Sequence, residues 1–401
     1  MRKKLIQINT VCNTSTGRIM HDIQKAASEE GFETLSFVGR RAPYSDLPCV
    51  KFGNPISFWL HVALNTVFDR QGYGSFLVTR RMVKRLREEK PDIIHLHNLH
   101  GYYLNLPVLF HYLKEEFKGE IYWTFHDCWP FTGHCAYFTM AGCDKWKTVC
   151  GECPCRKRYP VSLLSDASTK NFRDKQKLFT GLENLTILTP SVWMEKQIKE
   201  SFLKDYPVRV IPNGIDLKRF SYQLDDSVYE KYGIPENKHL LLGVADVWDT
   251  RKGFDDFLTL AKTLPEEYRI VLVGLSGVQM KELPSNIIGI KRTENQDELV
   301  KLYSVADLFV NPSLEESFSM VTVEALACGT PVIALNTSAV KELVREGNGI
   351  VLSGHETEDY LAAIREVENL RLTRQQVADT VLPYEKNRVL KQIVALYKEK
   401  A

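Results

Sequence analysis

Short apolar segments alternate with amphipathic ones along the whole chain, and this alternation constrains the fold more than any other feature. The segment "KKLIQIN" predicts a strand, "TSTGRIMHDIQKAASEEG" predicts a helix that ends at Gly31, and "FETLSFVG" predicts the next strand. The same rhythm begins again after "VRVIPNGID". A chain built in this way forms parallel sheets with helices on both faces. Further strands are predicted at "DIIHLHN", "EIYWTFHD", "LTILTPS", "HLLLGVADVW", "RIVLVG", "NIIGIK", "DLFVNPS" and "VIAL".

The length of 401 residues suits two domains, each able to bury a core of its own. The boundary is expected between Asp205 and Arg219, where the first alternating series has ended and the second has not begun. The sequence therefore predicts an α/β fold with two doubly wound, Rossmann-like domains facing one another across a cleft. The predicted ranges are 1–205, with a cysteine-rich insertion at 128–155, then 206–382, then a C-terminal helix at 383–401 that packs back across the junction.

The two halves of the chain differ in charge although the net charge is only +2. Residues 1–200 contain 28 Lys and Arg against 20 Asp and Glu, and the remaining residues contain 24 against 30. The small total argues against a nucleic-acid-binding protein. A basic first half is explained either by solvated helix faces or by an anionic partner, such as a phospholipid surface or a pyrophosphate-linked acceptor.

The beginning of the sequence, "MRKKLIQINTVCN", is expected to form a strand and not a signal peptide, because Gln7 and Asn9 interrupt its short apolar run. No apolar run in the sequence approaches the length that crosses a bilayer. We therefore expect a cytoplasmic protein, and peripheral contact with the inner face of the cytoplasmic membrane is the further expectation that the basic first half suggests.

Two acidic residues flank the start of a predicted helix in "LEESFSMVTVEALACGTPVIAL". A buried strand ends at Asn311, and a helix is predicted from Ser319 to Cys328. The loop between them leads into a helix N-terminus, where free backbone amides favour a phosphate. Carboxylates at Glu316 and Glu324 would then accept hydrogen bonds from hydroxyls on either side of that phosphate. The alternative is ordinary: acids that complement a helix dipole, and a solvated helix face.

Three further motifs lie at predicted strand ends. In "DTRKGF", Arg251 and Lys252 would neutralise a diphosphate, unless they belong to a solvated loop. In "TSTGRI", Gly17 would let backbone amides approach phosphate, although a single Gly is commonly a turn residue. In "TFHDCWPFTGHC", His126 would bond a sugar hydroxyl or share a proton with the acceptor, and its alternative is a core histidine paired with Asp127.

Six of the nine cysteines lie between residues 128 and 155. In a cytoplasmic protein such a cluster favours a metal over disulfides. One interpretation is a structural zinc site, and reduced structural thiols or a disulfide are the others, because the first two spacings match no standard zinc module. The expected zinc ligands are Cys135, Cys143, Cys150 and Cys153, with Cys128 or Cys155 as a replacement for one of them.

Taken together, these motifs resemble a known enzyme family. The segments "VIPNGID", "RKGF", "NPSLEESFSMVTVEALACGTPVIAL" and "VREGNGIVL" look like the nucleotide-sugar domain of the retaining glycosyltransferases of family 4, which have the GT-B fold. The segments "STGRI", "KPDIIHLHNLHGYYLNL" and "TFHDCWPFTGHC" are similar to a bacterial polysaccharide-biosynthesis branch of that family. The resemblance covers nearly the whole chain.

The resemblance implies a role for each candidate residue. Glu316 would hold donor-sugar hydroxyls, Glu324 the ribose hydroxyls, and Arg251 with Lys252 the diphosphate. Gly17 would approach the diphosphate from the first domain, and His126 would face the reacting sugar, so His126 and Glu316 are the catalytic candidates. The chain has Ser317, Phe318 and Ser319 where the family often has Gly-Phe-Gly, and these residues complete the expected donor site.

The implied reaction transfers a sugar from a UDP- or GDP-linked donor to a hydroxyl of a saccharide or lipid-linked saccharide, with retained anomeric configuration, in bacterial surface polysaccharide synthesis. No cofactor is expected for catalysis, since the sequence contains no convincing Asp-x-Asp element. Two other classes of function fit the same motifs. One is a sugar-nucleotide epimerase or glycan phosphorylase on the same fold, and the other is a zinc-bearing scaffold that only retains a nucleotide pocket.

Overall fold

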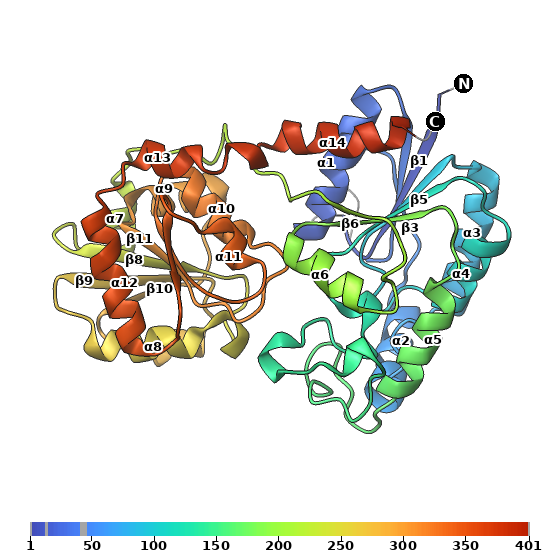
Figure 1. Ribbon diagram of the computed structural model, residues 1–401, viewed down its shortest axis with the longest axis horizontal. Helices are drawn as coiled ribbons and strands as arrows, with labels where there is room; N and C mark the ends of the chain where they lie inside the picture. The colour runs from blue at the N-terminus through green and yellow to red at the C-terminus, as the bar shows by residue number, and fades with distance from the viewer. Residues whose placement is uncertain (1, 13–14, 41–45, 400–401) are drawn as a thin grey trace. The chain divides into compact units, whose positions relative to one another are not determined.

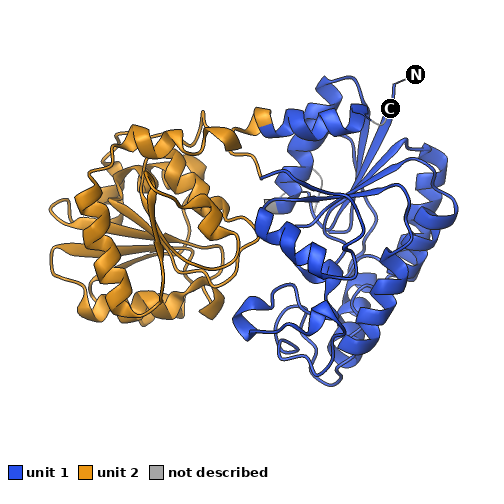
Figure 2. Cartoon of the chain, in the orientation of Figure 1, with its two compact units in different colours: residues 1–212, 389–401 blue, residues 213–388 orange. Residues whose placement is uncertain are grey.

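The computed structural model describes residues 2–12, 15–40 and 46–399, and these residues form two compact units. Unit 1 contains residues 1–212 together with residues 389–401, and unit 2 contains residues 213–388 (Figure 2). Each unit is built around one parallel sheet with helices on both faces, as Figure 1 shows. The predicted α/β class with two doubly wound domains is thereby confirmed.

The sheet of unit 1 has seven strands within the described residues, in the order β3-β2-β1-β4-β5-β6-β7. Every neighbouring pair runs parallel, so all strands end at the same edge. The sequence order reverses between β1 and β4, which is the point where sheets of this kind bind ligands. The strands are β1 Lys4–Asn9, β2 Glu33–Val38, β3 Cys49–Lys51, β4 Ile93–Leu96, β5 Glu120–Thr124, β6 Leu185–Thr189 and β7 Val208–Val210.

Two helices of unit 1 begin at an asparagine cap. Asn54 accepts a hydrogen bond from the backbone of Ser57 at the start of α2, and Asn105 does the same for Val108 in α4. Both helices carry a proline in the first turn, where its missing N–H is not needed. The helices are α1 Ser15–Glu29, α2 Pro55–Phe68, α3 Phe76–Glu89, α4 Leu106–Glu115, α5 Ser168–Phe179 and α6 Val192–Glu200.

The cysteine-rich segment follows β5 and contains no strand among its described residues. Three short 3₁₀ helices shape it: η1 Trp129–Phe131, η2 Thr139–Ala141 and η3 Lys145–Lys147. Trp129, Phe131, Phe138 and Trp146 are buried, and the rings of Phe138 and Trp146 stack with centroids 4.8 Å apart. The buried side chains of this segment therefore form one continuous apolar core with the rest of unit 1.

Unit 2 contains a six-stranded parallel sheet in the order β10-β9-β8-β11-β12-β13. Alternate residues of β8 face different cores: Leu240 and Leu242 pack with one helical layer, and Leu241 packs with the other. The strands are β8 His239–Val244, β9 Tyr268–Val273, β10 Ile287–Ile290, β11 Leu308–Asn311, β12 Val332–Leu335 and β13 Gly349–Leu352. The helices are α7 Ser227–Tyr232, η4 Thr250–Lys252, α8 Phe254–Thr263, η5 Gln279–Lys281, α9 Gln296–Val305, α10 Met320–Ala327, α11 Val340–Leu343, α12 Thr357–Leu370, α13 Arg374–Asp379 and η6 Leu382–Tyr384.

The last helix, α14 (Lys386–Glu399), belongs to unit 1 from Val389 onward. Its apolar side chains pack with β1 and α1, and Tyr397 is fully enclosed there. The hydroxyl of Tyr122 donates a hydrogen bond of 2.7 Å to the carbonyl of Leu396. The predicted apolar spacing of this helix thus serves burial in the core of unit 1.

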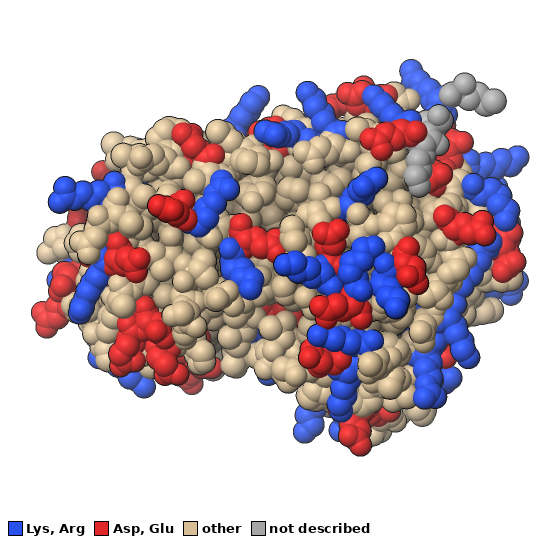
Figure 3. Space-filling view, viewed as in Figure 1, with Lys and Arg blue, Asp and Glu red and all other residues tan. Residues whose placement is uncertain are grey.

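The break between the units, after Pro212, lies within the interval from Asp205 to Arg219 that was expected from sequence, and beyond the end of the predicted range 1–205. Strand β7 (Val208–Val210) pairs with β6, so the first unit continues to Pro212 and does not stop at residue 205. A three-residue strand with an exposed Arg209 between two half-buried valines gives no clear apolar signal, which explains why the predicted range stopped before it. Within the described residues, no helix is long and apolar enough to cross a membrane. Basic and acidic side chains are interspersed on the face drawn in Figure 3.

Candidate functional site

The loop after β11 in unit 2 is held by a small polar cluster. The Asn311 side-chain amide donates hydrogen bonds of 3.0 Å to Ser319 Oγ and 2.8 Å to Thr322 Oγ1. Ser319 has a φ of +83°, which is unusual for a residue with a side chain, and it immediately precedes α10. The polar cluster therefore holds a backbone conformation that glycine would adopt at lower cost.

Lys252 and Glu316 come together at this loop. The Lys252 ammonium forms an ion pair with Glu316 Oε1, and both side chains are largely but not completely buried. The residues lie 64 positions apart, but their loops follow β8 and β11, which are neighbours in the sheet. The sequence prediction placed both residues at one sheet edge, and the structure brings them into direct contact.

The neighbouring contacts fix the two loops to one another. The Arg251 guanidinium donates a hydrogen bond of 3.1 Å to the carbonyl of Glu315, and the Leu314 amide donates one of 2.8 Å to the carbonyl of Arg251. Gly253 has a φ of +73°, and a Cβ atom there would lie 2.5 Å from the Pro312 side chain. Only glycine permits this close approach, so Gly253 sets the position of Lys252.

The sequence prediction did not assign Ser338 or Glu315 to this site. Ser338 Oγ accepts a hydrogen bond of 2.8 Å from the Glu316 amide, and the Glu316 carbonyl accepts one of 3.1 Å from the Ala339 amide. Glu315, beside the predicted Glu316, is the fully buried member of the pair. No pattern in the sequence distinguishes Glu315 from Glu316, because the loop has neither helical nor strand periodicity.

Glu324 lies one turn inside α10 and is half-buried. Its Oε2 accepts a hydrogen bond of 3.1 Å from the Tyr303 hydroxyl of α9. Burial, and then the Glu324 carboxylate, raise the pKa of Tyr303 well above its usual value, so this hydroxyl remains a donor at neutral pH. Tyr303 therefore orients Glu324, and only the remaining lone pairs of the carboxylate are available to a ligand.

The three residues between the two glutamates differ in environment. Phe318 is buried, with its ring edge against Tyr384 at a centroid distance of 5.6 Å. Ser317 is half-buried, and Ser319 is enclosed by the Asn311 cluster. Phe318 and Ser319 thus support the loop from within, which leaves Ser317 as the more accessible of the three predicted donor-site residues.

In unit 1, Gly17 lies in the first turn of α1, where it faces the end of the preceding loop. A Cβ atom at this position would lie 2.5 Å from the Cys12 carbonyl carbon and 2.8 Å from the Val11 oxygen. The helix N-terminus and the loop backbone can therefore approach one another only because residue 17 has no side chain. The contact explains the glycine structurally, and the approach of backbone amides to phosphate at Gly17 stays a prediction.

His126 follows β5 and stacks on His97, which follows β4. The ring centroids are 5.4 Å apart, with the rings within 13° of parallel, and His97 Nδ1 lies 3.1 Å from His126 Nε2. His97 Nε2 lies 3.0 Å from Gln7 Oε1, and the other end of the Gln7 amide donates to the carbonyl of Met20 at 2.9 Å. A chain of contacts thus runs from β1 through β4 to the end of β5.

This chain fixes the tautomer of His126. Burial lowers the pKa of His126 to about 4 and the pKa of His97 well below its usual value, so both imidazoles are neutral near pH 7. Because Gln7 presents its oxygen, His97 carries its proton on Nε2 and accepts at Nδ1. His126 therefore donates from Nε2, and its Nδ1, which has no hydrogen-bond partner in the described part of the chain, is an acceptor.

The predicted alternative for His126, a pair with Asp127, is not what the structure contains. Asp127 Oδ2 lies 2.7 Å from His100 Nε2, and His100 Nδ1 lies 2.8 Å from the Tyr159 hydroxyl. Burial raises the pKa of Asp127, but the charge and hydrogen bond of His100 outweigh it, and the net shift is downward. Asp127 is thus an ionised carboxylate whose partner is His100, and His126 hydrogen-bonds to His97 instead.

Acidification is expected to destabilise unit 1. Burial lowers the pKa of His61 to about 4, of His95 to about 3 and of His126 to about 4. Below pH 6.5 the unfolded chain binds protons at these side chains and the folded chain does not. The free energy of unfolding therefore falls as the pH is lowered. The fall is about 1.4 kcal/mol per histidine for each pH unit between 6.5 and 4.

Calorimetry at several pH values tests this expectation. The unfolding temperature should fall between pH 6.5 and pH 5, and His61→Gln should lose one histidine's share of that slope. His134 acts in the opposite direction: burial lowers its pKa, but the Asp69 carboxylate raises it more. The stability that His134 contributes to the folded protein is therefore present at low pH and is lost as the pH rises. An unfolding temperature that does not change over this range would contradict the assignment of neutral buried histidines.

The cysteine cluster contains thiols, and none of the nine cysteines forms a disulfide. Cys135, Cys143, Cys150 and Cys153 border one small cavity, together with Cys155 and with His134, whose buried Nε2 has no hydrogen-bond partner among the described residues. In residues 2–12, 15–40 and 46–399, no group of three or more His, Cys, Asp or Glu side chains is arranged to hold a metal ion. The donor atoms suit zinc, but structural zinc stays a prediction, which metal analysis of the purified protein would test.

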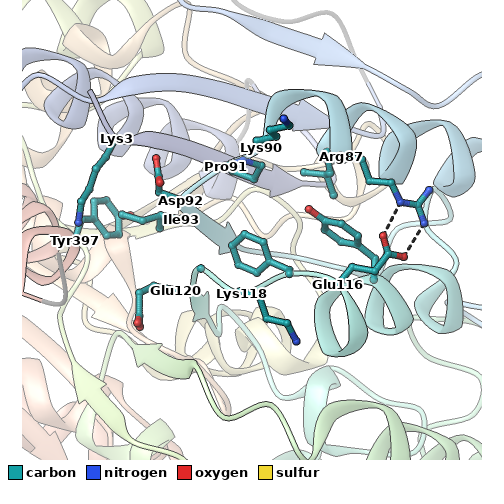
Figure 4. A pocket seen from close by; sticks show the side chains of 14 residues that line it. Lys3, Arg87, Lys90, Pro91, Asp92, Ile93, Glu116, Lys118, Glu120 and Tyr397 are labelled. Atoms are coloured by element: carbon teal, nitrogen blue, oxygen red, sulfur yellow. Dashed lines mark hydrogen bonds and ion pairs between the residues drawn. The ribbon is translucent and has the colours of Figure 1, made fainter. Parts of the chain in front are cut away.

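A larger cavity of about 610 Å³ in unit 1 is a different feature (Figure 4). Its lining includes Lys3, Asp92 and Glu120, which precede or begin β1, β4 and β5. Arg87 and Glu116 face one another at its rim in a two-pronged ion pair with both distances at 2.7 Å. The cavity therefore lies at the amino ends of the strands, opposite the edge that carries His97 and His126.

The arrangement of each unit has a definite chemical capacity. Unit 2 combines a cation, a helix N-terminus and two oriented carboxylates, which is a set suited to a phosphate flanked by hydroxyl groups. Unit 1 presents a neutral imidazole acceptor and a glycine-bounded helix start at the carboxyl edge of its sheet. A phosphorylated sugar offers a phosphate to the cation and helix N-terminus, and hydroxyl groups to the carboxylates and the imidazole.

Comparison with known proteins agrees with this chemistry. The description "Glycosyl transferases group 1" matches residues 226–380, and "Glycosyltransferase Family 4" matches residues 16–219. The chain is 26% identical over 307 residues to a protein of Escherichia coli (strain K12) named for glycosyl transfer in colanic acid biosynthesis, WcaC. The alignment covers 74% of this chain and 72% of that protein.

Two solved structures share the fold over nearly their whole length. Sucrose-phosphate synthase from Thermosynechococcus elongatus has a TM-score of 0.73 at 17% identity, with 100% of this chain and 99% of that chain covered. Anabaena Alr3699/HepE in complex with UDP-glucose has a TM-score of 0.68 at 15% identity, with 99% and 100% covered. With the second family description covering more than half of the chain, the protein belongs to glycosyltransferase family 4 and has its GT-B fold.

Proposed function

We propose that this glycosyltransferase moves a sugar from a nucleoside-diphosphate sugar to a hydroxyl of a saccharide or lipid-linked saccharide, with retained anomeric configuration. The pathway proposed is the synthesis of a bacterial surface polysaccharide. The similarity to a protein named for colanic acid biosynthesis supports the pathway. The observation that carries the chemistry is the ion pair of Lys252 and Glu316 beside the N-terminus of α10.

In this proposal Lys252 and the first amides of α10 neutralise the diphosphate. The leaving group gains negative charge as its bond to the sugar breaks, so a fixed cation stabilises the transition state more than the ground state. Arg251 contributes by holding the Glu315 carbonyl, which fixes the loop. These groups supply the charge that a metal ion supplies in other transferases, and we propose transfer without a catalytic metal.

The carboxylates hold hydroxyl groups on the two sides of the diphosphate. Glu316 is proposed to accept from donor-sugar hydroxyls and Glu324 from ribose hydroxyls, with Tyr303 holding the latter in place. When the donor binds, Lys252 exchanges part of its interaction with Glu316 for the phosphate. The ion pair thus keeps both groups ready in the unliganded protein.

From unit 1, His126 is proposed to accept a hydrogen bond from a hydroxyl of the transferred sugar through Nδ1. An imidazole with a pKa of about 4 is a weak base, so this role is positional and the leaving phosphate takes the acceptor proton at the same face of the sugar. Gly17 allows the start of α1 to approach the donor. We propose UDP as the carrier, because a structural neighbour is named for its complex with UDP-glucose, with GDP as the alternative.

A ligand screen tests the proposal. UDP- and GDP-hexoses are added to the purified protein, and a true donor at 100 times its dissociation constant should stabilise the folded protein by about 2.7 kcal/mol. Transfer is then followed with labelled donor. Label that leaves the nucleotide only when a saccharide is present supports a transferase, and the anomeric configuration of the product tests retention. Label that changes without an acceptor would indicate an epimerase.

A further inference from the structure

Helix α2 of unit 1 is a surface helix without a single charged residue. Its sequence, "PISFWLHVALNTVF", places Ile56, Trp59 and Leu60 on one face at helical spacing. These side chains are 75%, 66% and 68% exposed, so the face that meets water is apolar. A helix of a globular protein normally has charged or polar residues on such a face, and a contiguous apolar surface indicates an interaction site.

Neighbouring segments extend this apolar face at both ends. The Leu163 amide donates a hydrogen bond of 2.9 Å to the Thr66 carbonyl near the end of α2, and the Asn65 side chain donates one of 2.9 Å to the Val161 carbonyl. At the other end Ser57 Oγ lies 3.1 Å from Ser75 Oγ, directly before α3. The exposed apolar side chains carried there are Leu163 and Leu164 at one end and Phe76 and Leu77 at the other.

Two exposed arginines border this face. Arg80 and Arg81 lie one turn after Phe76 and Leu77 on α3, and the Arg80 guanidinium lies 5.7 Å from the centre of the Phe76 ring. Both arginines are exposed, and in the described residues neither has an acidic partner within ion-pair distance. Asp69, directly after α2, is buried against His134, and the exposed Asp166, two residues after Leu164, accepts hydrogen bonds from the Cys153 and Ser168 amides. The surface thus consists of seven apolar side chains bordered by two unpaired cations.

We propose that this surface, formed by α2, Leu163 and Leu164, and the start of α3, docks on a bilayer that contains anionic phospholipid. Exposed Trp and aliphatic side chains insert at the boundary between headgroups and acyl chains, and adjacent arginines attract anionic headgroups. A second copy of the chain fits less well. In a symmetric dimer the surface would meet itself, and it offers no acid to pair with Arg80 or Arg81.

The inference deepens the proposed function, because a lipid-linked acceptor is presented at a membrane surface. Only the reason for docking rests on the proposed function, and the docking surface itself does not. The contacts that carry it lie in unit 1 and do not involve any donor-site residue. Vesicle binding is measured without donor or acceptor, and donor binding is measured without vesicles. The failure of one proposal is therefore distinguishable from the failure of the other.

The test is sedimentation of the full-length protein with vesicles of phosphatidylcholine alone or with 30% phosphatidylglycerol added. We expect binding to the mixed vesicles only, with a shift of tryptophan emission to shorter wavelength, since Trp59 is the exposed member of the six tryptophans. Trp59→Ser with Leu60→Ser should weaken binding at least tenfold. Each basic residue beside an anionic surface strengthens binding by about fivefold, so Arg80→Gln with Arg81→Gln should weaken it by about 25-fold.

Two controls separate the surface from general effects. Leu224→Ser removes an equally exposed apolar side chain from unit 2, and Lys262→Gln removes an exposed cation there, and neither should change vesicle binding. The arginine variant keeps the test decisive if the Trp59 variant folds poorly, because neither arginine supports a buried group. Binding that is absent, equal on neutral vesicles, or unchanged in both variants overturns the proposal. So does a dimer in solution that Trp59→Ser with Leu60→Ser dissociates.

Discussion

Replacing Lys252 by Met is expected to lower kcat/KM for sugar transfer by about 100- to 1000-fold, the range found when a preorganised group facing a developing charge is removed. The Lys252 ammonium is held on Glu316 at the edge of the sheet, so it is in place before the donor binds. The methionine side chain has a similar volume but no charge. The loss should appear mainly in kcat, because the leaving diphosphate is most negative in the transition state.

Matched variants define what this loss means. Lys252→Arg keeps the charge and should retain much more activity than Lys252→Met. Lys262→Met makes the same chemical change at an exposed position on α8 and should leave the rate unaltered. Glu316→Gln should also lower the rate, and the double variant should lose less than the sum of both effects, because the two residues share one interaction. Normal transfer by Lys252→Met would remove Lys252 from the mechanism.

The contact of Lys252 with Glu316 shows what the sequence makes predictable. Each residue follows an apolar strand, and parallel strands bring their carboxyl ends to one edge, so both could be assigned to one site. The ion pair itself depends on β8 and β11 being neighbours, although β9 and β10 separate them along the chain. Periodicity predicts that strands exist, but their order in the sheet is decided by packing of the whole unit.

The supporting residues were not predictable for a related reason. Tyr303 and Ser338 contact Glu324 and the Glu316 amide from α9 and from the loop before α11, and neither stands in a motif. Their roles depend on side-chain direction after the helices have packed. Arg251 illustrates the limit in another way: its charge suggested a phosphate ligand, and the structure adds a backbone carbonyl as a partner of its guanidinium, which residue type did not indicate. Residue type indicates the available chemistry, and packing selects the partner.

Nuclear magnetic resonance of ring nitrogens should find His126 as the Nε2–H tautomer between pH 6 and 8. This follows from the chain of Gln7, His97 and His126, in which each hydrogen-bond direction is fixed by the previous one. His97→Phe keeps a stacked ring but leaves His126 Nε2–H without an acceptor in a buried place. The cost of one such group is about 1–3 kcal/mol, so we expect a changed tautomer and roughly tenfold or greater loss of kcat/KM.

His95→Phe is the control for this prediction. His95 is as deeply buried as His97 and also contacts two polar groups, the Tyr397 hydroxyl and Thr124 Oγ1, but it makes no hydrogen bond to His126. Both variants should therefore lose stability to a similar degree, and only His97→Phe should alter the tautomer of His126 and the rate beyond that loss. If His126 carries its proton on Nδ1 in the unaltered protein, the ring cannot accept a sugar hydroxyl there, and its proposed role is wrong.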